Sequence, residues 1–236
     1  MNAITVILIV TAIVALLVWL VYASASISSG VYVHTLCRAK TDKPVIALTF
    51  DDSPHPQQTP LILDILKEYN IKATFFAIGS NIEQYPDIAA RIVNEGHILG
   101  NHSYAHTSNF PLFSPNKMRD DVARCEALIE RITPPEQRYR LFRPPFGVTN
   151  PTIGKVVKEG GYTTIGWNIR SLDTVRPPLV AWQRIVKRIR PGSVILLHDR
   201  MPESHILLEK LIRWIDNEGY QIVNINELFD LKPQQV

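Results

Sequence analysis

The chain has 236 residues, 46% of them apolar, which is enough for one domain of about 200 residues with a substantial core and a short appendage. Its 25 basic and 22 acidic residues are well mixed, so no run of like charge marks a nucleic-acid-binding arm. The two cysteines, Cys37 and Cys125, are too few for a disulfide framework or a zinc knuckle, and the sequence leaves open whether they pair.

An apolar segment is the first predicted element. Ala3 to Tyr22 is almost unbroken in its apolar character, and the first 37 residues contain no Asp, Glu, Lys or Arg. This length suits a helix that crosses a bilayer. We predict a transmembrane anchor or uncleaved signal over residues 1–25 and a connector over residues 26–43. A cleavable signal peptide is the alternative, because residues 23–25 form a small-x-small site.

Short β-rich runs alternate with helical patterns through the rest of the chain, which we predict to be one domain over residues 44–236. The predicted strands are Val45–Phe50, Ala73–Ile78, His97–Gly100, Arg140–Arg143, Thr163–Trp167, Val194–His198 and Gln221–Asn224. Helices with a proline at their start are predicted at Asp87–Asn94, Asn116–Ile132 and Thr152–Lys158. Such alternation implies a parallel α/β sheet, either a small or distorted barrel or an open doubly wound sheet, with its active site at the C-terminal ends of the strands.

Two adjacent carboxylates, Asp51 and Asp52, come directly after the first predicted strand. Capping aspartates in a turn are the ordinary interpretation, but like charges beside a buried strand end are costly unless a cation offsets them. His102 and His106 follow the third strand and share one face if this segment is a helical turn. A lone pair at this spacing is usually two surface histidines. With an aspartate, however, the pair makes a three-ligand set that leaves a divalent metal open to water, and zinc, cobalt, nickel or iron would suit it.

Three further strand ends carry ionisable side chains. Arg143 follows the fourth strand in a proline-rich loop and is placed to offset the aspartates, although a surface arginine is the alternative. His198 ends the sixth strand and is either a candidate acid or a structural histidine. Asp173, beyond the fifth strand, is placed to orient His198. The convergence of these groups at one predicted rim indicates a hydrolase.

Taken together, these motifs resemble the NodB-homology polysaccharide deacetylases, carbohydrate esterase family 4, over residues 44–224. The matching segments are TFDDSP at 49–54, HSYAH at 102–106, RPPFG at 143–147, RSLD at 170–173 and LLHD at 196–199. The resemblance implies a distorted (β/α)7 barrel. It also implies a metal-dependent hydrolase that removes N-acetyl groups from an amino-sugar polysaccharide, such as peptidoglycan or a chitin-like oligomer.

The resemblance further implies a role for each matched residue. Asp51 would be the catalytic base and His198 the acid, while Arg143 would pair with the base and Asp173 would tune the acid. The implied ligands of the metal, most often zinc with cobalt or nickel as alternatives, are Asp52, His102 and His106. The implied oxyanion and substrate-binding residues are Phe146, through its backbone N–H, Pro145 and Leu196.

Three positions depart from the family pattern. Ser53 stands where the family usually has glycine, and a positive φ there would be strained. Arg170 stands where many members have an aspartate, and Thr174 where many have a tryptophan beside the substrate. The metal and acid/base residues are intact, so these differences concern the shape of the sugar site.

Alternative functions and the cellular location follow from the same features. A hydrolase of a small cyclic amide or ureide, an esterase acting on O-acetylated xylan and an inactive carbohydrate-binding pseudoenzyme are the competing interpretations. A polysaccharide substrate and the anchor predict a single-pass membrane protein with an extracytoplasmic catalytic domain. Three basic residues after the apolar run, Arg38, Lys40 and Lys43, favour the cytoplasmic side instead.

Overall fold

A curled parallel sheet of nine strands organises residues 1–234, the part of the chain that this computed structural model describes. Gln235 and Val236, the end of the predicted domain, lie outside the described residues. The strands are β1 (Thr35–Leu36), β2 (Val45–Ser53), β3 (Thr74–Ala77), β4 (Ile98–Asn101), β5 (Leu141–Phe142), β6 (Thr163–Ile165), β7 (Ile169–Arg170), β8 (Val194–His198) and β9 (Gln221–Ile222). Their order is β1-β6-β5-β4-β3-β2-β8-β7, with β9 beside β2, and the paired strands run parallel.

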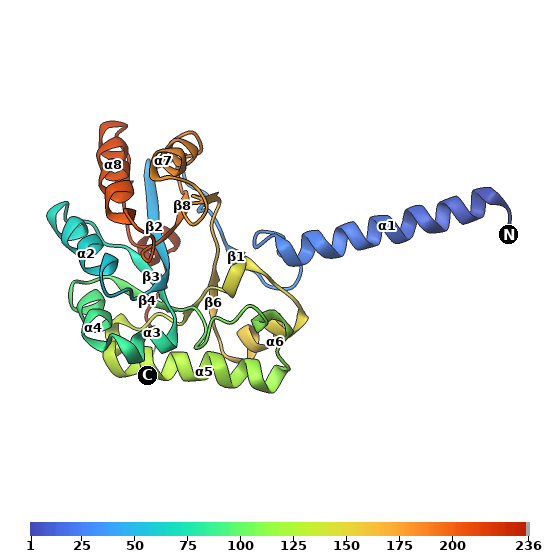
Figure 1. Cartoon of the computed structure of the whole chain (residues 1–236), viewed down its shortest axis with the longest axis horizontal. Helices are drawn as coiled ribbons and strands as arrows, with labels where there is room; N and C mark the ends of the chain where they lie inside the picture. The colour runs from blue at the N-terminus through green and yellow to red at the C-terminus, as the bar shows by residue number, and fades with distance from the viewer. Residues whose placement is uncertain (235–236) are drawn as a thin grey trace.

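Helices surround the outer face of this sheet, and one long helix extends away from the domain (Figure 1). The long helix is α1 (Ala3–Ala25). The others are α2 (Gln58–Glu68), α3 (Gly79–Gln84), α4 (Pro86–Asn94), α5 (Pro115–Ile132), α6 (Pro151–Glu159), α7 (Pro178–Val186), α8 (Ser204–Asn217) and α9 (Ile225–Phe229). Polar caps fix the starts of α5 and α6 among others, because Ser114 accepts a hydrogen bond from the N–H of Lys117 and Asn150 accepts one from the N–H of Ile153.

The predicted fold class is confirmed: the sheet is the incomplete, curled barrel of the (β/α)7 type, preceded by an apolar helix. All seven predicted strands are present, but β1 and β7 were not predicted. Both are only two residues long, too short to show a hydrophobic period. β1 lies within the segment predicted as a connector, and the chain after it bonds to the turn before β8, where the N–H of Ala39 donates to the carbonyl of Gly192.

Strand β2 shows how the sheet divides its two faces. Ile46, Leu48 and Phe50 belong to the core between the sheet and the helices. Ala47, at the intervening position, packs with residues such as Phe76 and Val194 inside the curl of the sheet. Because side chains alternate along a strand, Thr49 and Asp51 follow Ala47 to this inner face. The first of the two predicted aspartates is therefore aimed inward by strand geometry alone.

Helix α1 is apolar and uncovered except at its end. Its mean hydropathy is 3.1 over an 18-residue window, and none of that window is buried. The C-terminal end contacts the domain, because the Thr149 hydroxyl donates to the carbonyl of Ala23 at 3.0 Å and the Thr149 N–H donates to the carbonyl of Ser24 at 2.9 Å. These bonds fix the end of α1 near the loop that contains Phe146.

Candidate active site

The two aspartates both reach the site because the end of β2 is irregular. In regular strand geometry Asp51 and Asp52 would point to opposite faces. The register of β2 against β3 shifts between Asp51 and Ser53, and Asp52 has a φ of 72°. This bulge turns the second carboxylate toward the same opening as the first. The positive φ considered at Ser53 therefore lies at Asp52, and Ser53 is not among the described residues with a left-handed backbone.

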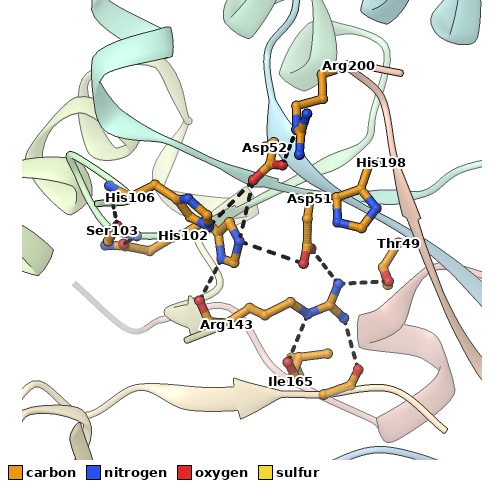
Figure 2. Close-up of polar contacts among 12 residues, drawn as sticks. Thr49, Asp51, Asp52, His102, Ser103, His106, Arg143, Ile165, His198 and Arg200 are labelled. Atoms are coloured by element: carbon orange, nitrogen blue, oxygen red, sulfur yellow. Dashed lines mark hydrogen bonds and ion pairs between the residues drawn. The ribbon is translucent and has the colours of Figure 1, made fainter. Parts of the chain in front are cut away.

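The two histidines lie side by side, with ring centroids 4.7 Å apart (Figure 2). The helical turn considered for this segment is wrong, because the chain after β4 is a loop. Left-handed backbone at Ser103 (φ 70°) and His106 (φ 45°) reverses the chain direction, and the Ser103 hydroxyl accepts the His106 N–H at 3.0 Å. The spacing of four residues thus brings the rings together through a tight loop.

A metal-ligand set is formed by Asp52, His102 and His106, whose candidate ligand atoms all lie within 4.8 Å of one another. Asp52 Oδ1 is 3.8 Å from Nε2 of His102 and 3.6 Å from Nε2 of His106. Ligands of tetrahedral zinc lie about 2 Å from the ion and hence about 3.4 Å from one another. The three residues therefore fit a divalent metal in their present positions.

The ionisation of these side chains also fits a metal. Nδ1 of His102 lies 2.7 Å from the carbonyl oxygen of Arg143, so it carries the proton and leaves the Nε2 lone pair facing Asp52. Burial and the neighbouring His102 lower the pKa of His106 to about 4, which keeps its ring neutral. Burial alone would raise the pKa of Asp52, but the two histidines and Arg200 lower it. Neutral imidazoles and an ionised carboxylate are the forms that bind metal.

Arg143 is fully buried beneath the aspartates, as a counter-ion and not as a surface residue. Its Nη1 donates to Oδ1 of Asp51 at 2.7 Å and to the Thr49 hydroxyl at 2.9 Å. Its remaining donors bind the carbonyls of Ile165 and Gly166. The other oxygen of Asp51, Oδ2, lies 3.7 Å from Nε2 of His102, on the side of the metal ligands.

His198 lies beside Asp51, because β2 and β8 are neighbours and these two residues are in register. Its Nδ1 is 2.8 Å from Oδ1 of Asp173, and its backbone N–H donates to the other oxygen of Asp173 at 2.8 Å. Burial works to lower the pKa of His198, but the hydrogen bond and charge of Asp173 outweigh it and the pKa is raised. The Ser171 hydroxyl donates to Asp173 at 2.8 Å and holds that carboxylate in place.

The two aspartates, the two histidines of the ligand set and His198 line a cavity of about 140 Å³, whereas Arg143 and Asp173 lie behind its wall. Of the three residues predicted to bind oxyanion or substrate, Phe146 and Leu196 line the cavity, while Pro145 is buried and not among its lining residues. Thr174 and Arg170, two of the departures from the family pattern, line it as well.

Two residues of the cavity were missed by sequence reasoning. Nε of Arg200 donates to Oδ2 of Asp52 at 2.5 Å (Figure 2). Its place two residues after His198 in the LLHDR segment was a usable signal. Trp167 lines the wall, although its position at the end of a predicted strand gave no reason to single it out. Elsewhere, Cys37 and Cys125 are both free thiols.

Comparison with known proteins gives this arrangement a family. The sequence model of the polysaccharide deacetylases matches residues 38–165. The chain belongs to the polysaccharide deacetylase family. A peptidoglycan-N-acetylglucosamine deacetylase of Bacillus cereus is 34% identical over 203 residues, which cover 82% of this chain and 71% of that protein.

Solved structures of polysaccharide deacetylases have the same fold. One peptidoglycan N-acetylglucosamine deacetylase superposes with a TM-score of 0.77 at 30% identity and covers 84% of this chain and 94% of its own. A Bacillus anthracis protein of carbohydrate esterase family 4, described as a pseudoenzyme, has the same TM-score at 32% identity. The match covers 85% of this chain and 70% of that protein. The family therefore includes both enzymes and inactive relatives, so the side chains at the site must decide between them.

Proposed function

We propose that this polysaccharide deacetylase is an active, metal-dependent hydrolase that removes the N-acetyl group from an amino sugar in peptidoglycan or a chitin-like oligomer. The observation that carries the proposal is the juxtaposition, on neighbouring strands, of a carboxylate held by Arg143 and an imidazole held by Asp173. A set of metal ligands lies beside them. An amide hydrolase needs a base, an acid and a stabilised oxyanion within one small cavity.

The metal site in this proposal consists of Asp52, His102 and His106. A divalent ion bound there, most often zinc with cobalt or nickel as alternatives, would supply Lewis acidity toward a water and the acetyl carbonyl. Because the ligand set has three members, it leaves room for these oxygens.

Asp51 is the proposed base. Arg143 holds Oδ1, so Oδ2 is directed toward the ligand set and can accept a proton from the attacking water. The buried guanidinium also places a positive charge beside two adjacent carboxylates, which would otherwise repel each other. Arg143 is therefore a positioning residue for the base.

His198 is the proposed acid. Its Nδ1 is held by Asp173, which leaves Nε2 for the substrate, and its raised pKa favours the charged form that donates a proton to the leaving amine. The backbone N–H of Phe146 is proposed to bind the developing oxyanion, and Leu196 to contact the acetyl methyl group. Pro145 supports this loop from the buried side.

We also propose that α1 is a membrane anchor, with the domain over residues 44–236 outside the cytoplasm. The exposed apolar surface of α1 has no protein partner in the described residues, which is the expectation for a helix in lipid. A substrate in the cell envelope requires the catalytic domain on that side, against the mild positive-inside bias noted above. Proteolysis of the domain in intact cells, compared with lysed cells, measures its side directly.

Acetate release tests the proposed function. The purified full chain, loaded with zinc or cobalt, should release acetate from peptidoglycan fragments or N-acetylglucosamine oligomers, and a chelator should abolish the release. Asp51→Asn is the blank: it keeps the metal ligands, and turnover should fall by about 10²–10⁴-fold. Acetate release from no N-acetylated glycan would contradict the proposal and favour the pseudoenzyme, whereas hydrolysis of a cyclic ureide instead would assign the chain to small amides.

A further inference from the structure

A second cavity, a groove of about 420 Å³, lies next to the candidate active site. One wall is the segment Ala25–Ser28 at the end of α1, and another is formed by Arg170, Arg184 and Arg188. No carboxylate is among its lining residues. The groove is thus a cationic space on the surface of a chain whose net charge is only +3.

The three arginines have no anionic partner within residues 1–234. None of them takes part in an ion pair there, unlike Arg200 and Arg143, which are both bound to aspartates. Nε of Arg184 donates to the carbonyl of Arg170 at 2.8 Å, and Arg188 donates to the carbonyl of Arg184, so the backbone ties the cluster together. Partial burial and the charges of Arg188 and Arg170 lower the pKa of Arg184, as expected for cations gathered without a counter-ion.

The groove adjoins the catalytic cavity. Phe146, Trp167 and Arg170 line both spaces, the two aromatic residues forming the ridge between them. The catalytic cavity, at about 140 Å³, is well below the roughly 300–1,000 Å³ of sites that enclose a whole small-molecule ligand. A glycan bound there must therefore continue outside the cavity, and the groove is the adjoining space.

We propose that Arg184 and Arg188, with Arg170, form a subsite for a carboxylate carried by the glycan on a sugar next to the one that is deacetylated. This inference rests on the proposed function and narrows it to an acidic N-acetylated glycan. Guanidinium groups bind carboxylates through paired, charge-assisted hydrogen bonds, and this chemistry matches the unpaired donors in the groove. The aromatic ridge would carry the sugar ring between the two subsites.

An anionic lipid headgroup has the same charge, and the end of α1 lies at the same groove. The glycan is the better match because the groove shares three lining residues with the catalytic cavity, so the arginines adjoin the reaction centre. A site for lipid would need no connection to that cavity. Binding of a lipid headgroup in the groove, with no effect on glycan choice, would overturn the proposal.

The test compares two tetrasaccharides of equal length with the full chain in neutral detergent. One consists of N-acetylglucosamine only, and the other alternates it with N-acetylmuramic acid, which adds carboxylates. The wild type should show a higher kcat/KM on the acidic tetrasaccharide, and the preference should shrink as salt is added, because the groove is exposed. In the Arg184→Gln/Arg188→Gln variant the ratio of the two kcat/KM values should fall by about tenfold.

Arg190→Gln is the matched control, because Arg190 is an exposed arginine two residues beyond Arg188 and is not among the groove's lining residues. It should keep the wild-type ratio. An unchanged ratio in the double variant, or an equal fall on both tetrasaccharides, would overturn the subsite. An unchanged ratio with weakened binding to phosphatidylglycerol vesicles would assign the groove to the membrane surface. Failure of the wild type on both glycans would instead count against the proposed function.

Discussion

The floor and the rim of the catalytic cavity differ in burial and in their likeness to the family pattern. On the floor, Asp51, His102 and Arg143 are at most 3% exposed, and each has the residue type that the family motif has at that position. On the rim, Arg170 and Arg200 are exposed, and Arg170 replaces an acidic residue of the family pattern. Buried ionic groups tolerate few substitutions, because each must satisfy its neighbours.

This difference indicates that the floor of the cavity determines the type of reaction and that the rim contacts the substrate. The floor contains the proposed base, the candidate metal ligands and the counter-ion, so we expect the type of reaction to follow from it. On the rim, Arg200 pairs with Asp52, whereas Arg170 forms no ion pair within residues 1–234 and is therefore free to contact the substrate. Substitutions of the buried groups should therefore change the reaction itself, and their expected effects differ in size.

The largest effect is expected for the metal ligands. His102→Ala should lose bound metal and at least about 10⁴-fold in kcat/KM, since the Lewis acid depends on that ring. Metal content by atomic absorption, measured alongside acetate release, gives the two readouts. The contrast is with Asp51→Asn, which should retain the metal. Full metal occupancy in His102→Ala would remove this histidine from the ligand set.

A large effect on stability is expected for the counter-ion. Arg143→Ala leaves Asp51 buried without its partner, which should lower the free energy of unfolding by about 3–5 kcal/mol. Urea unfolding of the metal-free protein measures this. Arg213→Ala is the control, because Arg213 pairs with Glu209 on the exposed face of α8 and should cost less than about 1 kcal/mol. Equal losses in the two variants would contradict the role of Arg143 beneath the cavity.

A smaller effect is expected for the partner of the acid. Asp173 raises the pKa of His198, so the charged imidazole persists to higher pH and kcat should decline only as pH rises through that pKa. In Asp173→Asn the pKa of His198 should fall, so the decline of kcat should begin at a lower pH. Ser171→Ala keeps the charge of Asp173 and removes the hydroxyl that donates to its carboxylate, so the pH at which kcat declines should shift less. Identical pH–rate profiles in the wild type and Asp173→Asn would disprove the tuning.

Much of the fold could be predicted because its strands are buried and its helices have clear starts. The hydrophobic runs of β2 and β8 and the proline-led helices α4, α5 and α6 give signals several residues long. β1 and β7 gave none, since two residues cannot show a period. The helical turn considered between His102 and His106 was wrong because loops with left-handed residues leave no periodic signal.

From the sequence alone one can predict seven of the nine strands, the apolar helix, three proline-led helices and the kinds of side chain at the strand ends. Those follow from local patterns of apolar and polar residues. Three features depend on the complete fold: Asp52 turns to the same opening as Asp51, Arg200 reaches Asp52, and Arg170 and Arg184 share a groove with the end of α1. The physical reason is that a bulge, and contacts between residues as many as 148 positions apart, depend on how the whole sheet curls, which no local window of sequence contains.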